Sequence, residues 1–153
     1  MIGKTDVEAL QKKWADGIVE IGAKYKAEGN YKEYAGEFAE RLYAYGKANV
    51  LFKPTMTSEI PFRPTIESAI SYFVSGNPNF AEDNGFALKP WKSIRFENHD
   101  IIEGENQTIA MGTYFFTDYN NEITEVIYTF GYIKFESGEV KINLHHSSLP
   151  VKK

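Results

Sequence analysis

The spacing of the apolar residues changes from a helical to a strand period along this chain, and this change constrains the fold more than any other feature of the sequence. Up to about residue 75, apolar residues recur mainly at steps of three and four, as in amphipathic helices. After about residue 85, apolar and polar residues alternate, as in strands that are buried on one face. Helices first and hairpins afterwards predict an α+β domain, with N-terminal helices packed on one face of a curved, mostly antiparallel sheet.

Three helices are expected in the first half of the chain. The first has Thr5 or Asp6 as its N-cap and ends at 28–30, where Gly and Asn tolerate a left-handed backbone. The second ends near Gly46, and the third is short and begins after a capping residue, Thr65. The apolar stripes of these helices are Val7, Leu10, Trp14, Ile18, Ile21 and Tyr25, then Tyr34, Phe38, Leu42 and Tyr45, and finally Ile66, Ile70 and Phe73.

A short strand over 50–55 separates the second helix from the third, and its proline suits a sheet edge or a strand end. Longer strands follow, with tight turns at 119–121 and 137–138. The whole sequence of 153 residues fits one domain, 1–153, with a single core. The predicted ranges of the longer strands are 88–103, 107–118, 123–136 and 139–148.

Composition and charge exclude several classes of partner. The net charge is −4 and no basic stripe is present, which argues against nucleic acid as a partner. The chain has no Cys, which removes disulfides, thiolate chemistry and Cys-based zinc sites together. No apolar run approaches the about 20 residues that span a bilayer, so no membrane partner is expected. The first residues lack the apolar core of a signal peptide, which predicts a cytoplasmic protein.

Aromatic residues make up 15% of the chain, so rings must line much of the interior or an interface. Two rows of them stand at alternate positions of the predicted strands, and they fit either sheet packing or a subunit interface. A self-associating sheet is therefore expected, with a homodimer as the first expectation. The rows are Tyr114 and Phe116, then Tyr128, Phe130 and Tyr132.

The last predicted strand closes with the polar run His145-His146-Ser147-Ser148. Because successive side chains of a strand point to opposite faces, His145 and Ser147 should share one face. Polar groups at the end of a core strand are costly unless they are paired or used, so this run indicates a site. Adjacent histidines that diverge cannot easily bind one metal ion, and His99 has no spacing relation to them. A zinc site would need distant carboxylates as additional ligands.

His145 has two interpretations at this level. An imidazole with an unperturbed pKa of about 6.5 suits a general base near neutrality, and Ser147 offers a hydroxyl on the same face. The alternative is a structural histidine whose ring nitrogens are both satisfied by neighbours. Ser147 is disfavoured as a covalent nucleophile, because the sequence around it contains no nucleophile elbow.

The predicted order of helices and strands leaves a cone whose mouth lies between the two layers, where small-molecule sites are common. Thr55, at the end of the short strand, and Tyr72, on the third helix, can both reach this mouth. Tyr72 stands off the apolar stripe of its helix, so it can face a cavity. A purely structural role also fits both residues. Arg63 and Lys53 could attract an anion, but solvated charges are the simpler interpretation.

Four motifs of the sequence resemble one family. They are VLFKPT at 50–55, FRPT at 62–65, FALKPW at 86–91 and HHSSLP at 145–150. Together they resemble the iota-class carbonic anhydrases, a group within the nuclear transport factor 2-like superfamily. That superfamily also includes the association domain of calcium/calmodulin-dependent protein kinase II. The resemblance extends over about 14–150, nearly the whole chain.

The resemblance implies a cone-shaped nuclear transport factor 2-like fold and a carbonic anhydrase that works without a metal and with no other cofactor. Its substrates would be CO2 and bicarbonate. The family's site residues match Thr55, Tyr72, His145 and Ser147 of this chain. In this scheme the hydroxyls hold the attacking water and the oxygens of the forming bicarbonate, while His145 orients the network or relays the proton.

Two other classes of function remain open at the level of sequence. A binding or assembly module of the kinase-association type would oligomerise and show no CO2 hydration. An enzyme like ketosteroid isomerase or a polyketide cyclase would need an acid in its cavity. The Asp and Glu residues of the predicted sheet cluster at turns, which weakens that second alternative.

Overall fold

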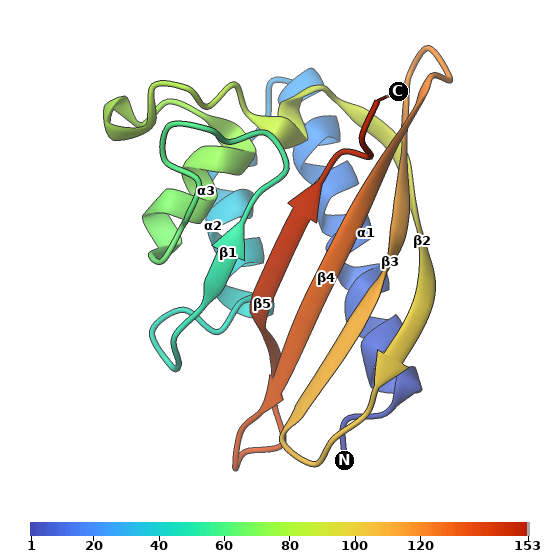
Figure 1. Ribbon diagram of the computed structural model, residues 1–153. Helices are drawn as coiled ribbons and strands as arrows, with labels where there is room; N and C mark the ends of the chain where they lie inside the picture. Colours follow the sequence, from blue (N-terminus) through green and yellow to red (C-terminus); the bar gives the residue numbers. More distant parts are fainter. Residues whose placement is uncertain (153) are drawn as a thin grey trace.

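The computed structural model describes residues 1–152, and it consists of helices packed against one sheet (Figure 1). Its elements are α1 (Lys4–Lys26), α2 (Tyr31–Leu42), β1 (Leu51–Lys53), α3 (Ile66–Val74), the short 3-10 helices η1 (Pro78–Phe80) and η2 (Phe86–Leu88), β2 (Trp91–Ile102), β3 (Gln107–Asp118), β4 (Ile123–Lys134) and β5 (Val140–Ser148). The strand order is β1-β5-β4-β3-β2, with β1 parallel to β5 and all other neighbours antiparallel. This arrangement confirms the predicted α+β class.

The helices cover one face of the sheet and leave the other face open (Figure 1). α1 packs on β2 and on α2, and α2 packs on α3. Strand alternation sends the two aromatic rows into the core between the layers, where each ring is at most 1% exposed. The packing interpretation of these rows is therefore confirmed, and their interpretation as a subunit interface is wrong. The buried rings are Tyr114, Phe116, Tyr128, Phe130 and Tyr132.

The helix boundaries differ from the predicted ones in two places. The N-cap of α1 is Gly3, two or three residues before the predicted one, because Asp6 stands inside the helix and its carboxylate accepts the Gly3 N–H at 2.9 Å. α2 ends at Leu42 instead of near Gly46, because Tyr43 is extended and forms a bridge to β5. The cap of α3 is confirmed, since the Thr65 side chain accepts the N–H of the third helical residue.

Prolines shorten two of the predicted strands. β1 covers only Leu51–Lys53 instead of 50–55, because Pro54 has no N–H to donate to a ladder. β2 begins at Trp91 instead of residue 88, because η2 and Pro90 precede it. The chain around 54–62 and 75–90 therefore forms two loops rather than sheet, and both loops lie beside α3.

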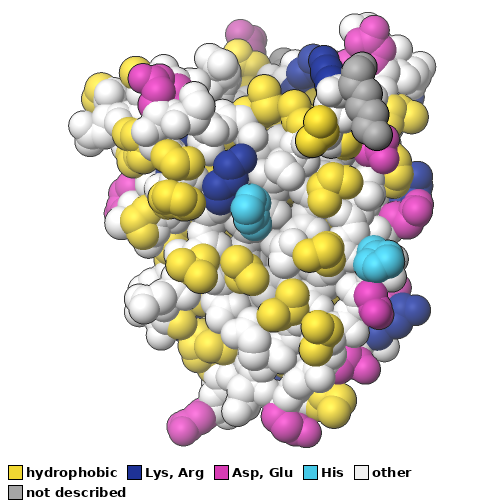
Figure 2. Space-filling model, viewed as in Figure 1, with side chains coloured by type: hydrophobic (Ala, Val, Ile, Leu, Met, Phe, Trp, Pro, Cys, Tyr) yellow, Lys and Arg dark blue, Asp and Glu magenta, His cyan; other side chains and the backbone are white. Residues whose placement is uncertain are grey.

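The open face of the sheet carries exposed apolar side chains. Figure 2 shows hydrophobic side chains scattered across this face, with acidic side chains at its edges. The exposed fractions are 69% for Leu51, 49% for Met111, 64% for Ile123 and 36% for Ile127. No helix within residues 1–152 is both long and apolar enough to cross a membrane.

Candidate active site

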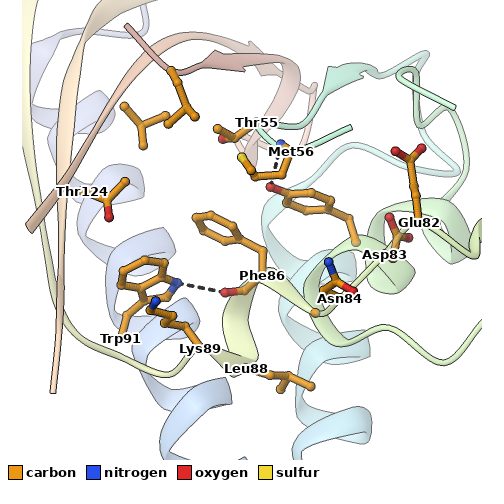
Figure 3. Close-up of a pocket in the computed structure, with 14 residues that line it drawn as sticks. Thr55, Met56, Glu82, Asp83, Asn84, Phe86, Leu88, Lys89, Trp91 and Thr124 are labelled. Carbon is orange, nitrogen blue, oxygen red and sulfur yellow. Dashed lines mark hydrogen bonds between the residues drawn. The ribbon is translucent and has the colours of Figure 1, made fainter. Parts of the chain in front are cut away.

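A cavity of about 480 Å³ lies beside α3, where the two loops meet the start of β4 and the end of β5 (Figure 3). Its walls are mainly apolar, and its polar side chains come mostly from the loops. Sites for small molecules have this combination of a concave apolar surface and a few polar groups. The lining residues are Thr55, Met56, Tyr72, Glu82, Asp83, Asn84, Gly85, Phe86, Leu88, Lys89, Trp91, Thr124, Val126 and Leu149.

Thr55 and Tyr72 both line this cavity, from the loop after β1 and from α3. The Tyr72 ring stacks on Phe86 with a centroid distance of 5.5 Å. The Tyr72 hydroxyl accepts a hydrogen bond from the backbone N–H of Met56 at 3.2 Å, so its own proton stays available for donation (Figure 3). Burial raises the pKa of Tyr72, so the hydroxyl is protonated at physiological pH.

His145 and Ser147 lie on the inner face of β5, where they are 2% and 1% exposed, whereas His146 and Ser148 are exposed on the outer face. The predicted division of the polar run into two faces is confirmed. Neither His145 nor Ser147 lines the cavity, in contrast to Thr55 and Tyr72. These two residues lie deeper, between the sheet and the helices.

Hydrogen bonds join His145 and Ser147 to three aromatic residues, and we name these five residues the inner network. The Trp14 indole N–H donates to the Tyr43 hydroxyl at 3.0 Å. The Tyr43 hydroxyl lies 2.7 Å from Nδ1 of His145. Nε2 of His145 lies 3.1 Å from the Tyr114 hydroxyl, which in turn is hydrogen-bonded to Oγ of Ser147. The network thus leads from α1 to the end of β5.

The direction of these bonds follows from Trp14, whose indole can only donate. Tyr43 accepts that bond, and within residues 1–152 its hydroxyl has no other partner than His145. We infer that Tyr43 donates to Nδ1, so that Nε2 carries the proton of His145 and donates to Tyr114. Tyr114 then donates to Ser147. The reverse direction would bury the Tyr43 proton without an acceptor, at a cost of about 1–3 kcal/mol.

His145 is held neutral in this network. Burial, together with the nearby His146, keeps the pKa of His145 well below its usual value. The ring also stacks between Phe52, at a centroid distance of 4.6 Å, and Phe130, at 3.9 Å. A neutral imidazole with both nitrogens engaged acts as a fixed donor to Tyr114 and is poorly placed to take up a proton.

Arg63 fixes the two loops that border the cavity. Its side chain is fully buried, so the interpretation of Arg63 as a solvated charge is wrong. Two guanidinium nitrogens donate to the two Asp83 carboxylate oxygens at 2.8 and 2.7 Å, and Nε donates to the carbonyl of Ile60 at 2.9 Å. This pairing ties the loop before α3 to the loop after it.

Glu82 completes the connection between the loops. Its carboxylate accepts backbone N–H bonds from Ser58 at 2.8 Å, Glu59 at 3.2 Å and Ile60 at 2.8 Å. These bonds hold the pKa of Glu82 below its usual value. Both acids of the cavity wall are therefore engaged in holding the loops, and neither is placed as the unpaired acid that an isomerase-like site needs.

Metal-binding groups do not gather at this site. Within residues 1–152, no three His, Asp or Glu side chains lie close enough together to hold one ion. The two histidines of β5 point to opposite faces, as their burial indicates. The carboxylates of the cavity wall are engaged by Arg63 and by backbone N–H groups, and the hydroxyls of Thr55 and Tyr72 line the same cavity.

The sequence matches a known family over nearly its whole length. The family model of the metal-independent carbonic anhydrases covers residues 5–149. The chain belongs to this family. One member, the metal-independent carbonic anhydrase of Nostoc sp., is 37% identical to it over 152 residues, which cover 97% of this chain and 74% of the relative. The family expected from the four motifs is confirmed, and with it the class of activity, carbonic anhydrase.

Solved structures agree with membership in the metal-independent carbonic anhydrase family. An iota-carbonic anhydrase from a cyanobacterium, solved in complex with bicarbonate, superposes with a TM-score of 0.96 at 36% identity, covering 99% of this chain and 94% of that one. A putative calcium/calmodulin-dependent protein kinase II association domain from Xanthomonas campestris gives a TM-score of 0.65 at 20% identity, with 99% and 91% covered. A nuclear transport factor 2-like protein of unknown function from Pseudomonas putida gives a TM-score of 0.61 at 8% identity, covering 97% of this chain and 87% of that one. The last two confirm the nuclear transport factor 2-like fold alone.

Tyr114 is a residue of this metal-independent carbonic anhydrase for which the sequence indicated only sheet packing or a subunit interface. Burial raises the pKa of its hydroxyl, and contacts with Ser147 and Thr55 lower it in part. The Tyr114 hydroxyl lies between His145 and Ser147 and is hydrogen-bonded to both. The only sequence signal was its place at an inward position of a strand, which it shares with many other aromatic residues.

Proposed function

We propose that this protein catalyses the reversible hydration of CO2 to bicarbonate and a proton, without a metal or another cofactor. In this proposal Thr55, Tyr72 and Ser147 supply hydroxyls, and His145 orients the buried part of the site. The observation that carries it is the inner network, which ends at Ser147 on β5, the strand beside β1, and β1 leads directly to the cavity-lining Thr55. Membership in the metal-independent carbonic anhydrase family supports it.

The mechanism has to replace what a metal supplies. A catalytic zinc lowers the pKa of bound water from about 15.7 to about 7. Without it a separate hydroxide is too costly, so the water must lose its proton while it attacks CO2. The hydroxyls of Thr55 and Tyr72 hold the water in the cavity, and the apolar wall holds CO2 beside it. Positioning of the two reactants then contributes much of the rate enhancement.

Ser147 stabilises the charge that develops on the oxygens of bicarbonate. Its oxygen accepts the proton of Tyr114, so its own proton is available to donate. Among residues 1–152 that proton has only a long bond of 3.5 Å, to the carbonyl of Ile127. We expect it to turn to a substrate oxygen as negative charge builds up there, because a preorganised donor lowers the energy of such a charge.

The proton that hydration releases leaves through the cavity in this scheme. The inner network ends at Trp14, which donates and cannot accept, so a proton has no exit in that direction. His145 therefore orients Tyr114 and Ser147 instead of relaying the proton. Solvent and buffer at the mouth of the cavity are the acceptors.

Treatment with a strong chelator is expected to leave the rate of CO2 hydration unchanged, because hydroxyls take the place of metal ligands in this mechanism. The measurement is stopped-flow hydration with a pH indicator, before and after exhaustive dialysis against chelator. A zinc-dependent carbonic anhydrase treated in the same way serves as the control. Loss of activity that added zinc or manganese restores would overturn the metal-independent mechanism.

Replacing Tyr43 by phenylalanine is expected to change the tautomer of His145, because it removes the donor to Nδ1. In the wild type, ¹⁵N NMR should show a neutral ring with its proton on Nε2. In Tyr43→Phe the Nδ1-protonated form should gain population, and CO2 hydration should fall roughly tenfold or more as Tyr114 loses its donor. The exposed His99 and His146 are internal references. A wild-type ring protonated on Nδ1 would reverse the direction assigned to the network.

We further propose that two copies of the chain associate through the open face of the sheet. The exposed apolar residues Leu51, Met111, Ile123 and Ile127 support this assignment. Sedimentation velocity tests it, with Met111→Lys and Ile127→Lys as variants that should yield monomers. A monomeric wild type at high concentration contradicts the proposal. The cytoplasmic location stays a prediction, which cell fractionation checks.

A further inference from the structure

The cavity is much larger than the proposed reaction requires. Its volume is about 480 Å³, whereas a water molecule occupies about 30 Å³ in the liquid and CO2 has only three heavy atoms. Pockets that bind organic molecules of ordinary size range over about 300–1,000 Å³. A reaction of CO2 with water thus leaves most of this cavity to another occupant.

The wall of the cavity is suited to a flat apolar group. Phe86 and Trp91 lie next to each other on one side, with ring centroids 5.5 Å apart and planes tilted by 41° (Figure 3). Val126 and Leu149 add aliphatic surface to the same cavity. Aromatic rings prefer offset or edge-on contact with other rings.

The polar side chains that remain available at the cavity all carry a hydrogen-bond donor, and none of them is negatively charged. The Asp83 carboxylate is taken by Arg63 and by the Ser71 hydroxyl, and that of Glu82 by backbone N–H groups. The hydroxyls of Thr55 and Tyr72 can donate, and Lys89 adds a positive charge on the wall. A ligand that matches these groups brings acceptors, and a carboxylate has the same planar pair of oxygens as bicarbonate.

We propose that the cavity binds a small monocarboxylate with a flat apolar body, of the size of benzoate. Its carboxylate lies at Thr55 and Tyr72, and its ring packs against Phe86 and Trp91. The assignment of the carboxylate end rests on the proposed function, because it takes the place of bicarbonate. Such a carboxylate competes with bicarbonate and makes the activity sensitive to aromatic acids.

Three probe molecules test the proposal by calorimetry on the wild-type protein: benzoate, acetate and benzamide. Benzoate should bind at least about tenfold more tightly than acetate, because its ring adds apolar contact. Benzamide, which has the ring without the charge, should bind at least about tenfold more weakly than benzoate. Equal affinity for benzoate and acetate would show that the apolar wall does not contribute to binding. Equal affinity for benzoate and benzamide overturns the assignment of a carboxylate.

A matched pair of variants locates the site. Thr124 lies on the cavity side of β4, and Thr129 lies on the opposite side of the same strand. Thr124→Trp places a large side chain in the cavity. It should weaken the binding of benzoate at least about fivefold and have little effect on the binding of acetate. Thr129→Trp should leave both affinities unchanged. Loss of benzoate binding in both variants, or in neither, places the site elsewhere.

The assay of CO2 hydration separates this inference from the proposed function. Benzoate should inhibit bicarbonate dehydration competitively, with an inhibition constant equal to its dissociation constant. Tight benzoate binding by a protein without any hydration activity would refute the proposed function and leave the carboxylate site standing. Full activity together with no preference for benzoate would refute the carboxylate site alone.

Discussion

Replacing Ser147 by alanine is expected to reduce the rate of CO2 hydration by roughly 100-fold or more, which is the usual effect of removing one donor to a developing oxyanion. The side chain is 1% exposed and is the last donor of the inner network. Its loss removes the hydroxyl proton that the mechanism aims at bicarbonate. It also removes the hydrogen bond between Tyr114 and Ser147. Both kcat and kcat/KM should fall together, because the lost bond forms in the transition state.

The neighbouring serine provides the control for this experiment. Ser148 follows Ser147 on the same strand but is exposed on the opposite face. Ser148→Ala should therefore keep the full rate, as should His146→Ala. Tyr72→Phe removes a second hydroxyl at the cavity and should lose most of the turnover while the protein still folds. Wild-type rates in stopped-flow assays of both Ser147→Ala and Tyr72→Phe would refute the proposed site.

Local periodicity was sufficient to predict the parts of the site that lie on one element. Alternation along a strand has a period of two, so the sequence places His145 and Ser147 on one face without any knowledge of the partner strands. The capping of α3 by Thr65 follows from the same kind of local rule. Residues that follow from short-range geometry were thus predictable.

The partners of His145 were not predictable in this way. Tyr114 reaches His145 from β3, with β4 lying between β3 and β5, so the contact depends on the registers of two strand pairs. Tyr43 reaches it from the end of α2, because the helix stops four residues earlier than its apolar pattern suggests. The spacing of apolar residues along the sequence does not determine strand registers or the packing of a helix end. Both tyrosines therefore resembled ordinary core residues.

Arg63 illustrates a different limit. In the sequence it stands between prolines at 61 and 64, and a solvated charge was the simpler interpretation. The structure buries it completely, because Asp83 from a distant loop neutralises it. A buried charge requires a partner that satisfies it, and a single sequence does not identify which acid that is. The position of Thr55 in the cavity therefore depends on an ion pair that only the folded chain reveals.

Replacing Asp83 by asparagine is expected to destabilise the protein by about 3 kcal/mol, because it leaves the buried Arg63 charge with only the more distant carboxylate of Glu82, 3.8 Å away. Arg63 and Asp83 both have 0% side-chain exposure. The shape of the side chain is kept, so the effect reports charge and not volume. Denaturant unfolding followed by circular dichroism measures the loss. The exposed pair Lys12 and Asp16 is the control, since Asp16→Asn should cost at most about 0.5 kcal/mol.

A double variant separates the effect of the buried charge on stability from the effect of the Arg63 hydrogen bonds on the position of the loop. In Arg63→Met/Asp83→Leu no buried charge remains, and most of the lost stability should return, because well-packed apolar residues often replace a buried ion pair without loss. The bonds of Arg63 to the carbonyls of Ile60 and Ser68 do not return. The loop that carries Thr55 then keeps only its bonds to Glu82, so CO2 hydration should stay low in a protein that is again stable. A change in unfolding free energy below about 1 kcal/mol for Asp83→Asn, or full activity in the double variant, would show that this ion pair does not position the site.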